Sequence, residues 1–399
     1  MSFTIQEPVL SKLKLSGDSS GDIKSRQSIN ARVDTDFDIH QQYWHSAVGN
    51  ALSKLLSSAG YSTRSQSRIL YQFVSLVAPY LGASPIFGQP PWKSFMTDNH
   101  TPVELSWDFH TGTSQPMIRY SMEPISLDAG TASNPHNETA ATDFTRRTME
   151  AFPDTDATLF DHFQDFFNRG WTKDTPEGHS TTMFWAFDLK DSATTNKAYF
   201  FPGAIAHATN TSTLDVVSAA IYSAPGCVPE SMISWPVFTD FVNQRVNLNL
   251  EMDMLALDLV PLGQSRLKVY FRDRRTNFNS VTEMMSLGGK VHGHQFDSGI
   301  RNLKSLWQAL LNTNELPDDA SLPQNDHRTA GILYNVEFRA HSELPKVKIY
   351  IPVRHYAQND MQIISALRGF LKKQCSNLPD APVEPVYAEY YSDCLQKIL

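Results

Sequence analysis

The sequence predicts an α+β fold in which antiparallel strands close into a barrel surrounded by helices. The first observation is a repeat, because an order of two helices and a two-stranded hairpin returns about every seventy to eighty residues. Each such unit needs its neighbours to bury its apolar faces, so the units belong to one domain. The second observation is that helices accompany every hairpin. Hairpins lying side by side with helices on one face close most easily into an antiparallel barrel.

The first unit contains all four elements. Apolar residues at helical spacing predict a helix over 40–60, which ends at Gly60, a residue suited to cap a helix C-terminus. A second apolar helix over 67–81 precedes a stretch rich in glycine and proline. Two segments with alternating apolar and polar residues predict strands over 103–109 and 117–123.

Three further units follow in the same order, and a fifth supplies helices alone. We expect the helices of the second to fourth units over 159–167, 212–224, 235–246 and 300–311, with a weaker helix just before 159 and a further segment near 279–287. We expect their strands over 181–189, 197–202, 250–260, 265–272, 331–340 and 346–353. The fifth unit has a helix over 359–374 and a C-terminal segment that ends in SDCLQKIL.

Composition disfavours several classes of function. A formal net charge of -8 argues against a general nucleic-acid or anionic-membrane surface. The sequence has no apolar run near the roughly eighteen residues that cross a bilayer. Its three cysteines lack metal-site spacing, and its start lacks a secretory signal. We therefore expect a cytoplasmic protein, either monomer or homodimer, with a flexible arm over 1–35 and a single domain over 36–399.

A cation two residues before a tyrosine recurs in the second strand of the hairpins. The motif reads KAYFF, RLKVYF and KVKIYI in three units, and an arginine stands in the corresponding strand of the first. Residues two apart on a strand point to the same side, and the residues between them here are apolar. In a barrel wrapped by helices, the apolar residues face the helices and the cations and tyrosines face the interior. The set comprises Arg119, Lys197, Arg266, Lys268 and Lys348, with Tyr199, Tyr270 and Tyr350.

Such an interior fits an allylic diphosphate as a substrate. Lysine and arginine bind diphosphate oxygens by charge-assisted hydrogen bonds. Tyrosine faces stabilise the carbocation that remains when the diphosphate departs, and they keep water away from it. The sequence has no Asp-rich DDxxD segment to hold magnesium, so we expect neither a metal nor another cofactor. For one strand alone, solvent-facing cations would be the simpler interpretation, but recurrence at equivalent positions favours one shared site.

Glu104 is a further candidate for a catalytic role. In the segment TPVELSWDF it shares a strand face with Ser106 and Asp108. A carboxylate at that place can accept the N–H of an indole, which fixes the ring and makes it a better nucleophile. The alternative is a surface glutamate.

Together these residues resemble the indole prenyltransferases of the dimethylallyltryptophan synthase type. The resemblance rests on YWHSAVGNALSKLLSSAGY, WKSFMTDNHTPVELSWDF, KAYFFPG, RLKVYF and KIYIPVRHYAQND, and it extends over most of the chain. It implies a prenyltransferase barrel and metal-independent transfer of a dimethylallyl group from dimethylallyl diphosphate to an indole, in secondary-metabolite or alkaloid biosynthesis. It assigns the indole N–H to Glu104, the diphosphate to the five cations and the shielding of the carbocation to the three tyrosines.

Two departures from the family pattern concern the aromatic substrate. Asp253 stands near the place where tryptophan-specific members carry an arginine for the substrate carboxylate, and Phe201 stands where a tyrosine can contact tryptophan. The resemblance therefore implies a tryptophan-containing cyclic dipeptide or a larger indole alkaloid. Its aromatic ring would lie in a pocket that includes Phe201 and Leu333.

A third departure lies at the C-terminus. Family members usually continue into a final hairpin, which this chain lacks. A barrel without that hairpin would expose two strand edges and admit water to the carbocation. Two alternatives to an active indole prenyltransferase therefore stay open: a weakly active or inactive barrel that only binds an aromatic ligand, and an enzyme that prenylates a phenolic or polyketide ring.

Overall fold

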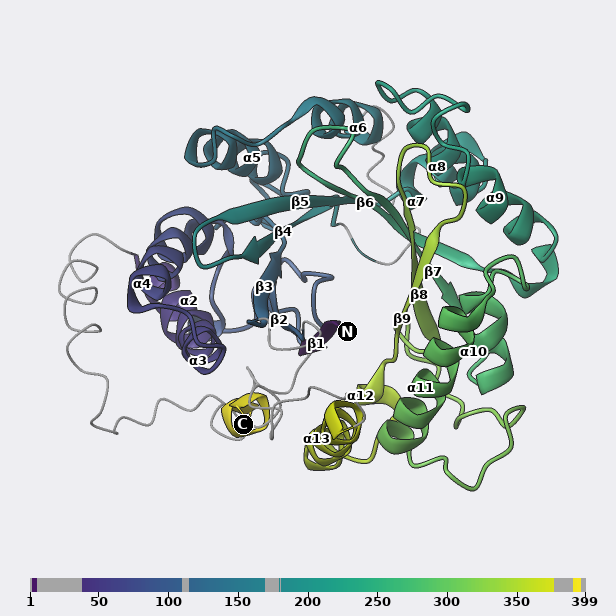
Figure 1. Ribbon diagram of the computed structural model, residues 1–399. Coiled ribbons are helices and arrows are strands. Elements are labelled where there is room, and N and C mark those ends of the chain that lie inside the picture. The colour runs from purple at the N-terminus through teal and green to yellow at the C-terminus, as the bar shows by residue number, and fades with distance from the viewer. Residues whose placement is uncertain are drawn as a thin grey trace. The chain divides into compact units, whose positions relative to one another are not determined.

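The computed structural model describes residues 2–5, 38–109, 115–168, 179, 181–376 and 390–395. The chain forms two compact units, and Figure 1 labels their helices and strands. Unit 1 comprises Met1–Thr155, Gly178–Lys197 and Asp380–Leu399, and unit 2 comprises Asp156–Glu177 and Ala198–Pro379. The prediction of a single domain over 36–399 stays a prediction.

Two helical stretches of mixed type form the first layer of unit 1. The carboxylate of Asp38 accepts hydrogen bonds from two backbone N–H groups and caps the first stretch. The Ser62 side chain caps the second stretch, which therefore begins at Thr63 rather than at the predicted residue 67. The first stretch consists of α2 (Ile39–Trp44), η1 (His45–Gly49) and α3 (Asn50–Ser58), and the second of α4 (Thr63–Gln72), η2 (Phe73–Val77) and η3 (Ala78–Tyr80).

The strands of unit 1 pair antiparallel in chain order. They are β1 (Ser2–Ile5), β2 (Val103–Asp108), β3 (Met117–Met122) and β4 (Met183–Leu189), and a helix, α5 (Ala140–Ala151), lies between β3 and β4 in the sequence. Strand β5 (Thr194–Phe200) begins in unit 1 and ends in unit 2. Strand β1 falls within the predicted flexible arm, whereas residues 6–37 of that arm lie outside the described residues.

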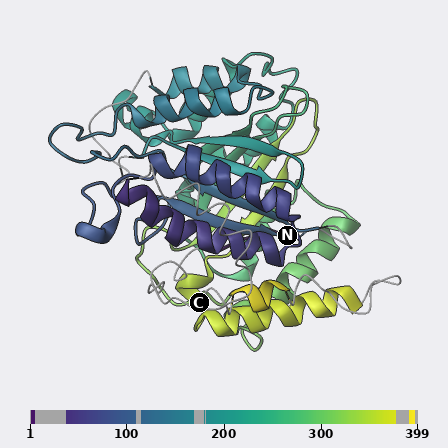
Figure 2. The same ribbon diagram turned by 90° about the vertical axis from the view of Figure 1, so that its left-hand side faces the viewer.

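One face of the unit 1 strands is apolar and lies under the helices. Leu105 of β2 stands opposite Tyr120 of β3, and both side chains are buried. The Tyr120 ring packs edge-to-face on Phe73 of η2, with ring centroids 5.7 Å apart. Figures 1 and 2 show the helical stretches α2–α4 over that side of the strands. The apolar residues that alternate along the strands therefore face the helices, as the sequence predicts.

Unit 2 repeats the order of helices and strands. Its helices are α6 (Thr158–Asn168), α7 (Gly203–Thr209), α8 (Thr213–Tyr222), α9 (Trp235–Asn243), α10 (Phe278–Met285), α11 (His294–Leu311), α12 (Val353–Tyr356) and α13 (Asp360–Ser376). Its remaining strands are β6 (Glu251–Asp258), β7 (Leu267–Asp273), β8 (Ile332–Phe338) and β9 (Lys346–Tyr350). Most of these elements match the predicted ranges within a few residues, but α7 and α12 were not predicted.

The unit 2 strands β6 to β9 also pair antiparallel in chain order. Phe271 of β7 is buried against Phe238 of α9, with ring centroids 5.6 Å apart, so the helices again cover the apolar face. A bulge interrupts β6 between Met252 and Met254, and leaves Asp253 without a partner in the register. No strand follows β9 among the described residues 351–376 and 390–395.

The last described helical turn, residues 390–395 in unit 1, packs on the apolar side of β2. The Tyr391 ring stands edge-on to Phe109 at 5.0 Å and lies 5.4 Å from Trp107. Trp107 belongs to the strand face opposite to Glu104, because the two residues are three apart on β2. Tyr391 therefore lies on the helix side of this strand.

Candidate active site

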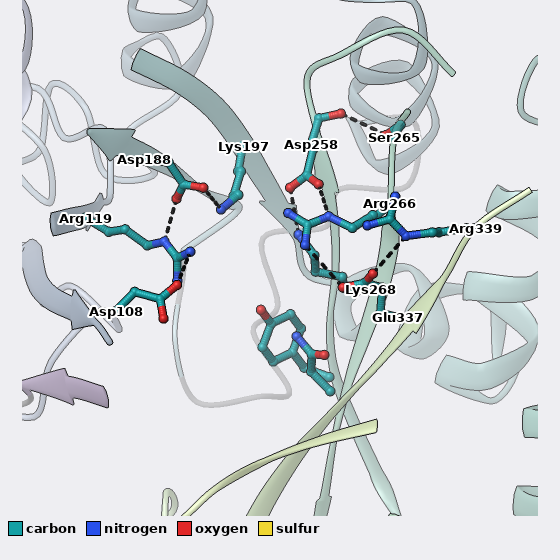
Figure 3. A network of polar contacts seen from close by, with 12 residues as sticks. Asp108, Arg119, Asp188, Lys197, Asp258, Ser265, Arg266, Lys268, Glu337 and Arg339 are labelled. Atoms are coloured by element: carbon teal, nitrogen blue, oxygen red, sulfur yellow. Dashed lines mark hydrogen bonds and ion pairs between the residues drawn. The ribbon is translucent and has the colours of Figure 1, made fainter. Parts of the chain in front are cut away.

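Two of the predicted cations in unit 1 surround one buried acid. Asp188 of β4 lies 2.7 Å from Nε of Arg119 on β3 and 2.5 Å from Nζ of Lys197 on β5. Asp108 of β2 contacts the same guanidinium, with Oδ2 2.6 Å from Nη2. Figure 3 shows the four side chains as one line of contacts. The side chains of Lys197 and Asp188 are each 8% exposed, so their attraction is only weakly screened by water.

The register of the strands places these charges together. Arg119 of β3 stands directly opposite Asp188 of β4 and opposite Ser106 of β2. Asp108 is therefore the diagonal neighbour of Arg119, within reach of a long side chain. Charged residues that point to the same side of neighbouring antiparallel strands thus form a row across β2, β3 and β4.

Glu104 lies on the cation-bearing face of unit 1. It stands four residues before Asp108 on β2, which is roughly 13 Å along the strand. Its side chain is half-buried, and its neighbour across the register is Ser121 of β3. This placement agrees with the strand face that the sequence predicts, whereas the indole contact stays a prediction.

Unit 2 holds two more of the predicted cations on one acid. Asp258, the last residue of β6, contacts Nε of Arg266 with one oxygen and lies 2.7 Å from Nζ of Lys268 with the other. Glu337 of β8 lies 3.3 Å from Nη1 of Arg266 and 3.1 Å from Nε of Arg339. Figure 3 shows this second network, in which three cations meet two acids. The network therefore has an excess of positive charge, which favours an anion as its ligand.

The three predicted tyrosines form a row in unit 2. The ring centroids of Tyr199 and Tyr270 are 5.8 Å apart, and those of Tyr270 and Tyr350 are 5.7 Å apart. The hydroxyl groups of Tyr270 and Tyr350 lie 3.4 Å from each other, and the Asn335 amide lies 3.4 Å from the hydroxyl of Tyr350. Burial raises the pKa of Tyr270 well above its ordinary value, so its phenol stays neutral. Rings that touch in this way offer a continuous aromatic surface.

The register connects the tyrosine row with the remaining predicted residues. Asn335 of β8 stands between Tyr270 on β7 and Lys348 on β9, and the Lys348 side chain is exposed. Leu333, half-buried, stands opposite Tyr350 on β9. Phe201 is buried directly after the end of β5.

An arginine lies against Asp253, at the position where the sequence led us to expect only acids. Nη2 of Arg272 on β7 is 3.0 Å from Oδ2 of Asp253. Arg272 stands opposite Leu333 in the register and follows Lys268 and Tyr270 on the same face of β7. It was not among the predicted site residues.

The structure thus groups the predicted residues within each unit. Arg119 and Lys197 share an acid in unit 1, and Arg266 and Lys268 share one in unit 2. The tyrosine row stands on the same strand face as Lys268. The assignment of all five cations to one diphosphate stays a prediction.

Sequence reasoning missed the acids that hold these cations. Each hairpin carries an acid between two apolar residues near the end of its first strand, in the segments WDF, FDL, LDL and VEF. These acids are Asp108, Asp188, Asp258 and Glu337. This repeat of an acid between two apolar residues is visible in the sequence and is the signal that identifies them.

Comparison with known proteins confirms the family that the sequence resembles. A model of the family described as tryptophan dimethylallyltransferase matches residues 40–378. The 4-O-dimethylallyl-L-tyrosine synthase of Claviceps purpurea is 36% identical over 347 residues, which are 85% of this chain and 78% of that protein. The 7-dimethylallyltryptophan synthase of Aspergillus fumigatus is 33% identical over 371 residues, 85% of this chain and 77% of that protein.

Solved structures share the fold. The structure of NotF in complex with brevianamide F and DMSPP superposes with a TM-score of 0.76 at 22% identity, over 93% of this chain and 89% of NotF. That of AnaPT from Neosartorya fischeri gives a TM-score of 0.74 at 24% identity, over 92% and 87% of the two chains. These likenesses, with the antiparallel strands and helices of both units, confirm the predicted α+β fold class, the prenyltransferase barrel. The described residues contain no final hairpin.

None of the helices that the structure describes is long and apolar enough to cross a membrane.

Proposed function

This chain belongs to the tryptophan dimethylallyltransferase family and is an aromatic prenyltransferase, and from this premise we propose the reaction that it catalyses. It transfers a dimethylallyl group from dimethylallyl diphosphate to the indole ring of a tryptophan-derived acceptor. The observation that carries this proposal is the row of Tyr199, Tyr270 and Tyr350 beside Arg266 and Lys268 in unit 2.

The cations act on the leaving group. When the bond between C1 and oxygen breaks, the electron pair leaves with the diphosphate, and its new charge is stabilised by Lys and Arg donors. Asp258 holds Arg266 and Lys268 in place before the substrate arrives, so little reorganisation is needed. Arg119, Lys197 and Lys348 are proposed to contact the same diphosphate. A metal ion is not required in this scheme, because the fixed cations supply the positive charge.

The tyrosines act on the allylic cation. Their ring faces stabilise the positive charge by cation–π attraction, and the continuous surface excludes water that would capture the cation as an alcohol. A bond then forms between the allylic carbon and a ring carbon of the acceptor. The ring passes a proton to the released diphosphate or to water and so recovers its aromaticity. Glu104 is proposed to accept the indole N–H and so to orient the ring and enrich it in electrons.

The class of acceptor depends on Asp253. The expectation of a cyclic dipeptide or a larger indole alkaloid followed from the lack of an arginine at that position, and NotF, whose structure contains brevianamide F, shares the fold. Arg272, however, lies 3.0 Å from Asp253, so a guanidinium stands beside this position after all. A cyclic dipeptide or larger indole alkaloid stays the proposed acceptor, and free tryptophan is the alternative, which this guanidinium and the relative named as a 7-dimethylallyltryptophan synthase support.

Prenylation of a phenolic ring is the second candidate. One relative at 36% identity is named as a 4-O-dimethylallyl-L-tyrosine synthase. In that reaction Glu104 would accept the proton of the phenol, and the new bond would form to the phenolic oxygen. The cations and the tyrosine row would serve both reactions in the same way.

Turnover with purified protein tests the proposal. The full chain is incubated with dimethylallyl diphosphate and one acceptor at a time, either in EDTA or with added magnesium. The acceptors are L-tryptophan, L-tyrosine and a tryptophan-containing cyclic dipeptide. Mass spectrometry is expected to find an acceptor heavier by one dimethylallyl group, with indole acceptors ahead of phenols. Absence of every prenylated product, in EDTA and with added magnesium alike, would overturn the proposed reaction and favour the alternative of a barrel that only binds an aromatic ligand. Product that forms only with magnesium would overturn the metal-independent scheme.

A further inference from the structure

Unit 1 contains a cavity that the proposed reaction does not use. Its volume is about 320 Å³, a size at which proteins bind small molecules. The described residues that line it come from α2, from the segment 81–102 before β2 and from the turn 125–129 after β3. None of these lining residues is one of the predicted site residues. The cavity is therefore separate from the candidate active site.

Two buried tryptophans line this cavity. Trp44 of α2 is 5% exposed, and Trp92 of the segment before β2 is 8% exposed. The indole N–H of each is already bonded to the protein: Nε1 of Trp44 donates to the carbonyl of Gly82 at 3.0 Å. Nε1 of Trp92 donates to the carboxylate of Glu123 at 3.0 Å. Both rings are therefore held in place, and what they offer to a ligand is apolar ring surface.

Close packing fixes the shape of the cavity. Gly130, in the turn after β3, has a φ of +79°, and a Cβ there would lie 2.8 Å from the backbone of Pro91 and Trp92. Gly82 has a φ of +67°, and a Cβ there would lie 2.7 Å from Cγ2 of Ile125. The turn therefore packs directly on the segment that carries the second tryptophan. Walls fixed in this way reduce the entropy that binding costs.

The polar side chains around the cavity are basic or neutral. Lys93 and His100 line it, and both are exposed. No aspartate or glutamate is among the described residues that line it. Nδ1 of His100 lies 3.0 Å from the carbonyl oxygen of Ser94, which anchors the imidazole to the same segment. Lys93 therefore gives the cavity a permanent positive charge without an acid beside it in the lining.

Three acids lie near the lining without being part of it. Glu123 already accepts the tryptophan N–H, and burial raises its pKa to about 7, so it is partly neutral at physiological pH. Asp128 accepts a hydrogen bond from Oγ of Ser126 at 3.0 Å within its own exposed turn. Asp98 precedes a lining residue in the sequence but does not line the cavity. The charge that faces the cavity itself therefore comes from Lys93.

We propose that this cavity is a second ligand site, for an aromatic carboxylate whose ring lies against Trp44 and Trp92 and whose carboxylate pairs with Lys93. Fixed tryptophan rings favour a flat aromatic ring as the ligand. One cation, with no acid in the described lining, favours a single anionic group on that ring. A neutral aromatic molecule gains the ring contact alone and binds more weakly, and an aromatic cation is repelled by the ammonium group.

Calorimetry on the full chain tests the site with two probes that differ in charge. Indole-3-acetate is expected to bind about 10-fold more tightly than the neutral indole-3-acetamide. Lys93→Met is expected to weaken binding of the acid about 10-fold and to change the Kd of the amide less than about twofold. Lys190→Met is the control, because Lys190 is an exposed lysine of unit 1 that does not line the cavity. It should leave both Kd values unchanged.

A substitution that fills the cavity separates this site from the active site. Ala83 is half-buried and lines the cavity, so Ala83→Phe is expected to remove one binding event per chain for both probes. The variant should keep the wild-type denaturation midpoint within experimental error and should prenylate the acceptor at the wild-type rate. An Ala83→Phe variant that binds the probes with wild-type stoichiometry would overturn the inference, as would an equal loss of acid and amide binding in Lys93→Met. Absence of any binding to the wild-type chain would be equally contrary.

Discussion

Asp188 and Lys197 meet at 2.5 Å across the hairpin of β4 and β5, each with 8% of its side chain exposed. The same pattern of an acid on the first strand and a cation on the second returns at Asp258 and Lys268 in unit 2. The acids therefore position the cations that are proposed to bind the diphosphate. Replacement of either acid should therefore lower both the stability of the fold and the affinity for the diphosphate.

Asp188→Asn should lower the free energy of unfolding by about 3 to 5 kcal/mol, because it leaves a buried ammonium without its counter-charge. Chemical denaturation measures this change. Glu150→Gln is the control, since its ion pair with Arg146 is mostly exposed and should contribute less than about 1 kcal/mol. An Asp188→Asn variant as stable as the wild type would contradict a positioning role for this acid.

Lys268→Met should raise the KM for dimethylallyl diphosphate about 10- to 100-fold and leave the KM for the acceptor nearly unchanged, because a charge-assisted hydrogen bond to the diphosphate is lost. Initial rates at varied diphosphate concentration measure it. Lys304→Met removes a half-exposed lysine that pairs with Asp318, and it should behave as the wild type. Equal effects on both substrates would argue for a general structural defect.

Tyr270→Ala should divert the allylic cation to water, because it opens a gap between Tyr199 and Tyr350. The ratio of dimethylallyl alcohol to prenylated acceptor, measured by mass spectrometry, should rise several-fold. Tyr270→Phe keeps the ring and should keep the ratio close to that of the wild type. A ratio that Tyr270→Ala leaves unchanged would rule out shielding by this ring.

Glu104→Gln should lower kcat for the indole acceptor by about 100-fold or more, because the amide is a weaker acceptor for the indole N–H than a carboxylate. The KM for the diphosphate should change little. Glu138→Gln, at an exposed position in unit 1, serves as the control. A Glu104→Gln variant with the wild-type rate would remove this residue from the mechanism.

Glu123 should make stability depend on pH. Burial raises its pKa from 4.5 to about 7, although Ser94 and Trp92 donate hydrogen bonds to it at 2.5 and 3.0 Å. Between these two pKa values the folded chain keeps a proton that the unfolded chain releases, so stability falls as pH rises through this window. Glu123→Gln removes the ionisation. It should unfold at nearly the same denaturant concentration as wild type at pH 4 and be more stable by on the order of 3 kcal/mol at pH 8. A difference that stays constant from pH 4 to pH 8 would contradict this prediction.

The strands and their orientation could be predicted because both depend on local pattern. Alternation along β3 and β7 indicates which residues share a face, and the burial of Phe271 and Tyr120 under helices confirms it. The charged partners could not be assigned in this way. Which acid meets Lys268 depends on the register between β6 and β7, and a shift of one residue would turn Asp258 to the other face.

The sequence by itself determined the repeated α+β units, the cation and tyrosine positions and the resemblance to a family, because each follows from residue spacing within one strand or helix. The tertiary structure alone decided that Asp188 and Asp258 hold those cations and that Arg272 lies against Asp253. The physical reason is that these contacts join residues on different strands. Their distances are set by strand register and by the bulge at Asp253, which no local pattern encodes.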